Sequence, residues 1–274
     1  MKNMTGISKS VKKDGTIYYR ASLTYKGKHI SLGSSTSAET AHQMYKVGTD
    51  ILEKNLHIAD YSSASALPFD KWISLINMRD NKVYLKNPIY MHASFFSYFL
   101  SPSVELKFDI DDLFFYSEHR IQERGGHLFC ENYGTQISLR SRYGIHPFSV
   151  KGRDYRFLNG DDTDFRYENI EVINHYMGVE KIRVRYQTKW QASINVRGVM
   201  RLGVYPTEEE AAIAFNKALD MLESIGQKKT GLTPNYIDNM PGSKYADIYT
   251  ELTLSERFTS YIETVRAKND LSPD

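Results

Sequence analysis

The chain has 274 residues and a formal net charge of +2, and 41% of its residues are hydrophobic and 25% charged. This length suits two or three small domains, and this composition is that of a globular protein rather than a disordered chain. No run of about 18 apolar residues and no apolar leader is present, so we expect a cytoplasmic protein without membrane contact. Cys130 is the single cysteine, so we expect neither an intrachain disulfide nor a bound metal or cofactor.

The first 58 residues predict a sheet followed by a helix. Apolar residues alternate with polar ones in two-residue steps between positions 19 and 26, which indicates a strand with one buried face. Gly27 is typical of a hairpin turn. Thr36 and Glu39 predict a helix start, with Thr36 as the N-cap. The helix is expected to bury Ala38, Ala41, Tyr45 and Leu52 against the sheet.

If this helix covers the apolar side of the sheet, the polar side is left bare. Seven basic residues stand against one acid, Asp14, in the first thirty positions. Such a basic block predicts contact with a polyanion. We expect DNA contacts from Lys12, Arg20, Ser22, Thr24, Lys26 and Lys28, with Ser31 on the same face.

Residues 59–102 are expected to be a linker and accessory segment. The serine- and alanine-rich stretch 61–66 is typical of a linker. The aromatic-rich stretch from Pro88 to Pro102 is too short to span a membrane, so it predicts buried core or a partner contact.

Residues 177–226 repeat the pattern of the first 58. A basic strand, a second strand with Trp190 and Ala192 on its apolar side, a turn at Gly198 and a third strand lead into a helix. Thr207 and Glu210 again form the helix-start pattern. Six basic residues face one acid, Glu180, between positions 178 and 201. The bare face is expected to bind DNA through Lys181, Arg183, Arg185, Gln191, Ser193, Asn195, Arg197 and Arg201.

Both copies resemble the apetala/ethylene-response-factor (ERF) type DNA-binding domain. The resemblance lies in the basic strand, the W/Y-x-A-x-I/L strand, the Leu-Gly pair and the T-x-E-E-A-A-x-A-F/Y helix start, and the second copy matches more closely. It implies a three-stranded antiparallel sheet packed on one helix, which reads the major groove of double-stranded DNA through the sheet. Arginine, lysine, asparagine and glutamine are side chains that bond base edges and phosphates.

Residues 103–176 resemble the HNH homing-endonuclease domain, through the segment from Tyr155 to Asn174 and the segment from Phe108 to Gln122. The family's catalytic aspartate and histidine align with Arg156 and Phe157, and a further family histidine aligns with Arg140. Asn169 matches the family's late asparagine. Phenylalanine cannot accept a proton and arginine cannot hold Mg²⁺. The resemblance therefore implies a degenerate ββα-metal-like domain with no catalytic residues, and we expect no enzyme activity.

These patterns predict an α+β protein in which two ERF-type domains flank a degenerate HNH-like domain, followed by a tail, residues 227–274, with a helix from Leu254 to Val265. We expect a sequence-specific DNA-binding protein, a repressor that occupies a promoter or operator site of phage or mobile-element DNA in a bacterial host. An active homing endonuclease or nickase with a relocated base is the alternative, and an architectural protein that binds without sequence preference is a third. The tail helix predicts either a contact within the chain or a homodimer contact.

Overall fold

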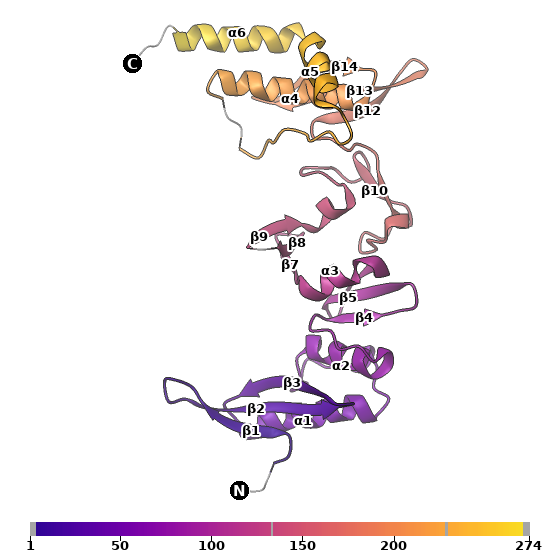
Figure 1. Ribbon diagram of the computed structural model, residues 1–274, viewed down its shortest axis with the longest axis vertical. Coiled ribbons are helices and arrows are strands. Elements are labelled where there is room, and N and C mark those ends of the chain that lie inside the picture. The colour runs from indigo at the N-terminus through magenta and orange to yellow at the C-terminus, as the bar shows by residue number, and fades with distance from the viewer. Residues whose placement is uncertain (1–3, 133, 228–229, 271–274) are drawn as a thin grey trace. The chain divides into compact units, whose positions relative to one another are not determined.

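The computed structural model of the protein describes residues 4–132, 134–227 and 230–270, and it has a mixed α+β fold (Figure 1). The chain forms two compact units. The first contains Met1–Leu139 and Asp161–Asn169, and the second contains Arg140–Gly160 and Ile170–Asp274. In the part of the chain that the structure describes, no helix has the length and apolar character needed to cross a bilayer.

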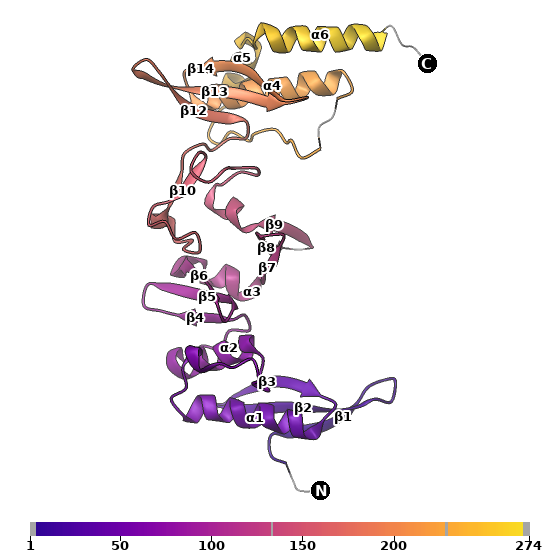
Figure 2. The ribbon, with the colours of Figure 1, turned by 180° about the vertical axis from the view of Figure 1, so that it is seen from behind.

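The N-terminal module consists of a three-stranded antiparallel sheet and one helix. Strands β1 (Ile7–Val11), β2 (Ile17–Tyr25) and β3 (Lys28–Ser35) pair in that order. Helix α1 (Ala38–Glu53) lies along one face of this sheet (Figures 1 and 2). The predicted strand-strand-strand-helix order is confirmed, because the apolar residues of β2 and β3 alternate onto the face that α1 covers. The buried residues are Ala21, Leu23, Ile30 and Leu32 from the sheet and Ala41 and Ile51 from the helix.

The start of α1 differs from its prediction by one residue. Ser37, not Thr36, is the N-cap, and its hydroxyl accepts a hydrogen bond from the Thr40 backbone N–H at 3.3 Å. Strand β3 continues to Ser35, so the chain turns one residue later than the sequence pattern indicated.

Helix α2 (Phe69–Asn81) lies within the segment 59–102 that was expected to be a linker and accessory segment. Five apolar residues of α2 are buried in the same cluster as the N-terminal module: Trp72, Ile73, Leu75, Ile76 and Met78. The Arg79 guanidinium donates hydrogen bonds to the carbonyl oxygen of Ile51, in the last turn of α1, at 2.9 Å and to that of Leu56, just after α1, at 2.7 Å. Helix α2 therefore extends the core of the N-terminal module.

The aromatic-rich segment 88–102 forms buried core, which settles one of its two predicted roles. Strands β4 (Ile89–Met91), β5 (Phe95–Ser101) and β6 (Val104–Asp109) form an antiparallel sheet, and Phe96 and Tyr98 are fully buried in it. Because β5 pairs with β6 across residues 102 and 103, the expected domain boundary falls inside a hairpin.

The rest of the first unit consists of a short helix, a further small sheet and a loop segment that follow β6. Helix α3 (Leu113–Glu118) packs Tyr116 on Phe108, with ring centroids 4.2 Å apart. A third sheet contains β7 (Ile121–Arg124), β8 (His127–Asn132) and β9 (Thr135–Ser138). The segment 161–169 runs beside β6, where the Lys107 backbone bonds to Thr163 and Phe165.

The second unit contains the C-terminal module. Strands β12 (Val179–Val184), β13 (Gln187–Asn195) and β14 (Val199–Tyr205) form an antiparallel sheet, and helix α4 (Glu208–Ser224) lies along one of its faces (Figures 1 and 2). Thr207 is the N-cap of α4, as predicted, and accepts from the Glu210 N–H at 3.2 Å. A two-stranded pair, β10 (Tyr155–Phe157) and β11 (Ile170–Val172), precedes the module.

The tail packs on the C-terminal module. Helices α5 (Gly242–Glu251) and α6 (Glu256–Asp270) follow α4, and α6 runs five residues past the predicted end at Val265. Phe258 and Ile262 of α6 are buried in the same apolar cluster as α4 and its sheet. Of the two expected roles of the tail helix, the structure shows a contact within the chain.

The internal repeat extends to backbone detail. Gly6 and Gly178 stand at the same place before the first strand of each module, with φ values of +80° and +74°. The carbonyl oxygen of Gly6 accepts from Ser22 N at 3.0 Å, and that of Gly178 accepts from Ser193 N at 2.8 Å. Both central strands have a register shift at this point. The two modules are therefore built in the same way.

Asp154 joins β10 and β11 to the approach to β12. Its buried carboxylate accepts hydrogen bonds from Val150 N at 2.7 Å, Asn174 Nδ2 at 2.8 Å and the Arg153 guanidinium. Burial alone raises the pKa of the Asp154 carboxyl, but these hydrogen bonds outweigh burial and lower the pKa below 3.8. The Asn174 side-chain oxygen in turn accepts from Lys181 N at 2.8 Å, so Asp154 helps to place β12.

We expect Asp154→Asn to lower the free energy of unfolding of the second unit by about 2 kcal/mol at neutral pH, because a charged acceptor with several donors is lost. A carboxyl whose pKa is lowered by folding stabilises the protein above its unfolded pKa, and this stabilisation is lost as the pH falls. The difference between variant and wild type should therefore shrink below about pH 3.8. Chemical denaturation at several pH values measures this, with the exposed Asp247→Asn as the control. A difference that does not depend on pH would contradict the assigned role.

Candidate nucleic-acid interface

The first open face is the side of the N-terminal sheet that α1 does not cover. Residues that are directly opposite in an antiparallel pair lie on the same face of the sheet. Ala21 faces α1, so its neighbours Arg20 and Ser22 lie on the other side, together with their partners across β1 and β3. The first open face consists of Ser8, Ser10, Tyr18, Arg20, Ser22, Thr24, His29, Ser31 and Ser34.

This face is polar along its whole length, and Arg20 is its one arginine or lysine. The Arg20 guanidinium donates a hydrogen bond to the Tyr18 hydroxyl and lies 5.3 Å from the centre of the Tyr18 ring. Both contacts hold the arginine over the sheet. The face therefore offers one oriented cation among hydroxyl groups, which can donate or accept hydrogen bonds.

The structure places three of the six expected first-copy residues, Arg20, Ser22 and Thr24, on the open face. Lys12 follows β1 and is exposed. Lys26 is in the β2–β3 turn with φ +48°. Lys28 pairs with Tyr25 on the side that α1 covers, so the structure does not place Lys28 among the open-face residues.

The second open face is the corresponding side of the C-terminal sheet. Ala192 and Ile194 are buried toward α4, so Gln191, Ser193 and Asn195 lie on the opposite side. Their cross-strand partners complete the face. The second open face consists of Glu180, Ile182, Val184, Gln187, Lys189, Gln191, Ser193, Asn195, Val199, Arg201 and Val204.

The register of β12 shows that one lysine and one arginine expected on the open face lie on the other side of the sheet. Lys181 pairs with Trp190, and Arg183 pairs with Thr188, so both lie on the α4 side of the sheet. The cause is Val179, which is buried opposite Ala192 and sets the alternation of the whole strand. Ile182 and Val184 lie on the open face instead, and Val184 is 38% exposed.

The structure also shows where the remaining polar residues of the second copy lie. Arg185 and Arg197 are in hairpin turns at opposite ends of β13, and both are exposed. Asn195 is on the open face, but its side-chain oxygen accepts from Gly198 N at 3.2 Å and so also holds the turn. Lys189 lies on the open face opposite Ile182, and the sequence analysis missed it as a contact residue. Lys189 is two residues before Gln191 on the same strand, so the alternation of β13 is the signal that would have found it.

The four central residues that the HNH resemblance singled out make contacts within the chain. Phe157 is buried and pairs with Ile170, and Arg156 forms an ion pair with Glu171 on the neighbouring strand. Asn169 is buried, and its amide donates to the carbonyl oxygens of Asp161 at 3.2 Å and Asp164 at 2.8 Å. Arg140 lies 5.5 Å from the centre of the Tyr155 ring.

We also searched for groups that could support chemistry. Among the described residues, no three His, Cys, Asp or Glu side chains form a cluster suited to a metal ion. A serine–histidine contact exists between Ser97 Oγ and His92 Nε2, at 2.9 Å, and the same hydroxyl donates to Glu105. Ser97 is fully buried in its sheet, so its hydroxyl is closed to a substrate.

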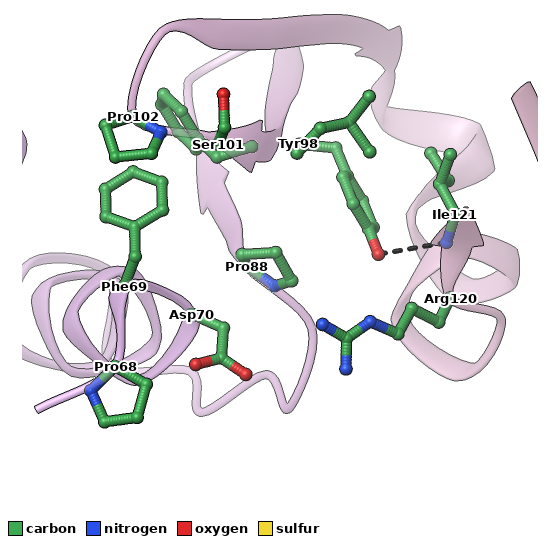
Figure 3. Close-up of a pocket in the computed structure, with 11 residues that line it drawn as sticks. Pro68, Phe69, Asp70, Pro88, Tyr98, Ser101, Pro102, Arg120 and Ile121 are labelled. Atoms are coloured by element: carbon green, nitrogen blue, oxygen red, sulfur yellow. Dashed lines mark hydrogen bonds between the residues drawn. The ribbon is translucent and has the colours of Figure 1, made fainter. Parts of the chain in front are cut away.

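The first unit also contains a pocket of about 450 Å³ between α2, β5 and the start of β7 (Figure 3). Asp70 and Arg120 both point into it, and Phe69 and Pro102 form one wall. Burial raises the pKa of Tyr98 to about 12, and the Tyr98 hydroxyl oxygen accepts a hydrogen bond from Ile121 N at 3.1 Å. Of the described residues that line the pocket, none is a histidine or cysteine.

Comparison with known proteins adds no relative: no family model, no curated protein and no solved structure matches the chain.

Proposed function

We propose that the protein binds double-stranded DNA sequence-specifically through its two open faces. The observation that carries this proposal is the duplication itself. Two modules of one chain have the same sheet, register shift and covering helix, and each leaves the same side of its sheet uncovered. A major groove admits a protein element of this width and presents a distinct pattern of donors and acceptors for each base pair.

The side chains on the two faces suit different parts of that recognition. Gln191 offers a paired donor and acceptor, which matches the major-groove edge of adenine. Arg20 and Arg201 can bond to guanine or to phosphate. The exposed lysines and arginines around the turns, including Lys12, Arg185 and Arg197, fit phosphate contacts. We therefore assign base recognition to the centres of the faces and phosphate contacts to their ends.

We further propose that the protein is a transcriptional repressor on phage or mobile-element DNA in a bacterial cytoplasm, and that it descends from a homing endonuclease that lost its catalytic residues. Phe157, which the sequence resemblance aligns with the general base, supports this view because it is a buried packing residue. A specific binder without strand cleavage acts by occupying a site, and a site that overlaps a promoter excludes polymerase.

The test is a selection from genomic DNA fragments of phage and host, carried out with the purified chain in buffer with Mg²⁺. We expect intact fragments enriched for one locus, with an affinity at least 10³-fold above that for random DNA at the same salt concentration. Equal binding to all fragments would overturn sequence specificity and favour an architectural role. A common new DNA end inside the enriched site would overturn the loss of catalysis.

A further inference from the structure

The first unit also has a group of lysines that lies outside the first open face, beside the β2–β3 hairpin tip. It consists of four lysines, which we call the lysine cluster: Lys26, Lys28, Lys71 and Lys82. Two come from the β2–β3 hairpin, one from α2 and one from the end of α2. No sequence pattern predicted α2, so these lysines were not expected to lie together.

Tyr84 is the centre of the lysine cluster. The Lys28 and Lys71 ammonium nitrogens lie 5.0 Å and 5.6 Å from the centroid of its ring. Lys71 Nζ also donates to the Tyr84 hydroxyl at 2.9 Å. A cation over an aromatic ring is attracted by the negative face of the ring. The tyrosine therefore holds two positive charges in a small volume.

Lys26 and Lys82 extend the cluster. Both have left-handed backbone conformations, with φ values of +48° and +66°, because one is in the hairpin turn and the other caps the C-terminus of α2. Partial removal of solvent, and then the charge of Lys26, lower the pKa of the Lys82 ammonium. The two like charges are thus close enough to disfavour each other.

The lysine cluster carries a positive charge that Asp80 offsets in part. Within residues 4–132, 134–227 and 230–270, none of the four lysines forms an ion pair. The nearest acid that acts on Lys82 is Asp80, which is already bound by Arg79 at 2.7 Å and by the Tyr90 hydroxyl at 3.3 Å. A concentration of positive charge that is offset only in part within the chain is a site for an external anion.

We propose that the lysine cluster binds the phosphodiester backbone of the DNA that the protein recognises. This inference rests on the proposed function and adds a phosphate clamp on the flank of the N-terminal module. The hairpin tip at Lys26 and Gly27 ends the first open face, where Thr24 pairs with His29. A duplex on that face has its phosphates at the rims of the groove, and long lysine side chains beside the tip can reach them.

The test compares the salt dependence of DNA binding between the full-length wild type and the double variant Lys28→Gln/Lys82→Gln. Each phosphate contact contributes about 0.9 to the slope of log K against log salt concentration. We expect the slope of the double variant to fall by about 1 to 2, with an equal loss of affinity for the selected site and for random DNA. The control Lys46→Gln/Lys54→Gln removes two exposed lysines, one in α1 and one that follows it and pairs with Asp50, and its slope should stay that of the wild type. Thermal unfolding of each variant shows that the fold is kept.

A second measurement follows the Lys82 ammonium by NMR in lysine-labelled protein. Addition of the selected DNA should raise the Lys82 pKa, because a phosphate compensates the charge of Lys26. Wild-type binding to DNA with an unchanged slope in the double variant and an unchanged Lys82 pKa would overturn the phosphate clamp and leave the proposed function standing. A wild type that binds no DNA at any salt concentration would overturn both.

Discussion

Replacement of Gln191 by alanine should weaken binding to the selected DNA site by about 1–3 kcal/mol, or roughly 5- to 160-fold, while binding to random DNA changes little. Gln191 is at the centre of the second open face, between Glu180 on β12 and Val204 on β14. Its side-chain amide has both a donor and an acceptor for one base. Titration of both DNAs at one salt concentration measures the difference.

Lys181→Ala is the matched control for Gln191→Ala. The sequence alone assigned both residues to the same face, but the structure places Lys181 opposite Trp190 on the side of α4. We expect Lys181→Ala to leave the ratio of specific to random binding unchanged, because any contact from this side is to phosphate. A loss of specificity equal to that of Gln191→Ala would contradict the register and the assignment of the open face.

Replacement of Gly178 by alanine should lower the free energy of unfolding of the C-terminal module by about 3–4 kcal/mol. The backbone of Gly178 has φ +74°, and a Cβ there would lie 2.3 Å from the Phe215 ring and 2.6 Å from the Ser193 carbonyl oxygen. An alanine would be strained in its backbone and would also push apart α4 and β13. Chemical denaturation followed by tryptophan fluorescence reports on the module, because Trp190 packs against its core.

Gly226→Ala separates the two causes. Gly226 has φ +71°, but nothing lies within 4 Å of the position of an added Cβ. We expect its cost to be that of the backbone alone, about 1–2 kcal/mol. If Gly178→Ala and Gly226→Ala lowered the free energy of unfolding equally, the close approach of Gly178 to Phe215 would not contribute to the cost. Gly6→Ala, where the added Cβ would lie 1.9 Å from the Tyr45 ring, should repeat the effect in the N-terminal module.

The elements that local patterns predict well are those whose signal lies within one strand or helix. The alternation around Ala21 and Ala192 predicted the buried faces of β2 and β13, because neighbouring side chains of a strand point to opposite faces. The N-cap Thr207 was predicted because its hydroxyl bonds to an N–H only three residues away. These are short-range effects, and the repeat of the pattern at both ends of the chain reinforced them.

Helix α2 and strand β12 show where local patterns mislead. The serine-rich stretch before α2 is typical of a linker, but α2 is fixed by distant contacts, such as that of Arg79 with Ile51 and Leu56. In β12 the polar residues alternate with Ile182 and Val184, which suggested a basic open face. The strand phase is instead set by Val179, which is buried opposite Ala192 on another strand.

By itself, the sequence determined that each end of this chain forms three strands and a helix, since periodicity, glycine turns and helix caps are encoded within about fifty neighbouring residues. Only the tertiary structure decided which side chains share a surface. A shift of one residue in strand phase moves every side chain to the opposite face, and that phase depends on pairing between strands. The lysine cluster around Tyr84 likewise exists because α2 folds back beside the β2–β3 hairpin, which no local pattern indicates.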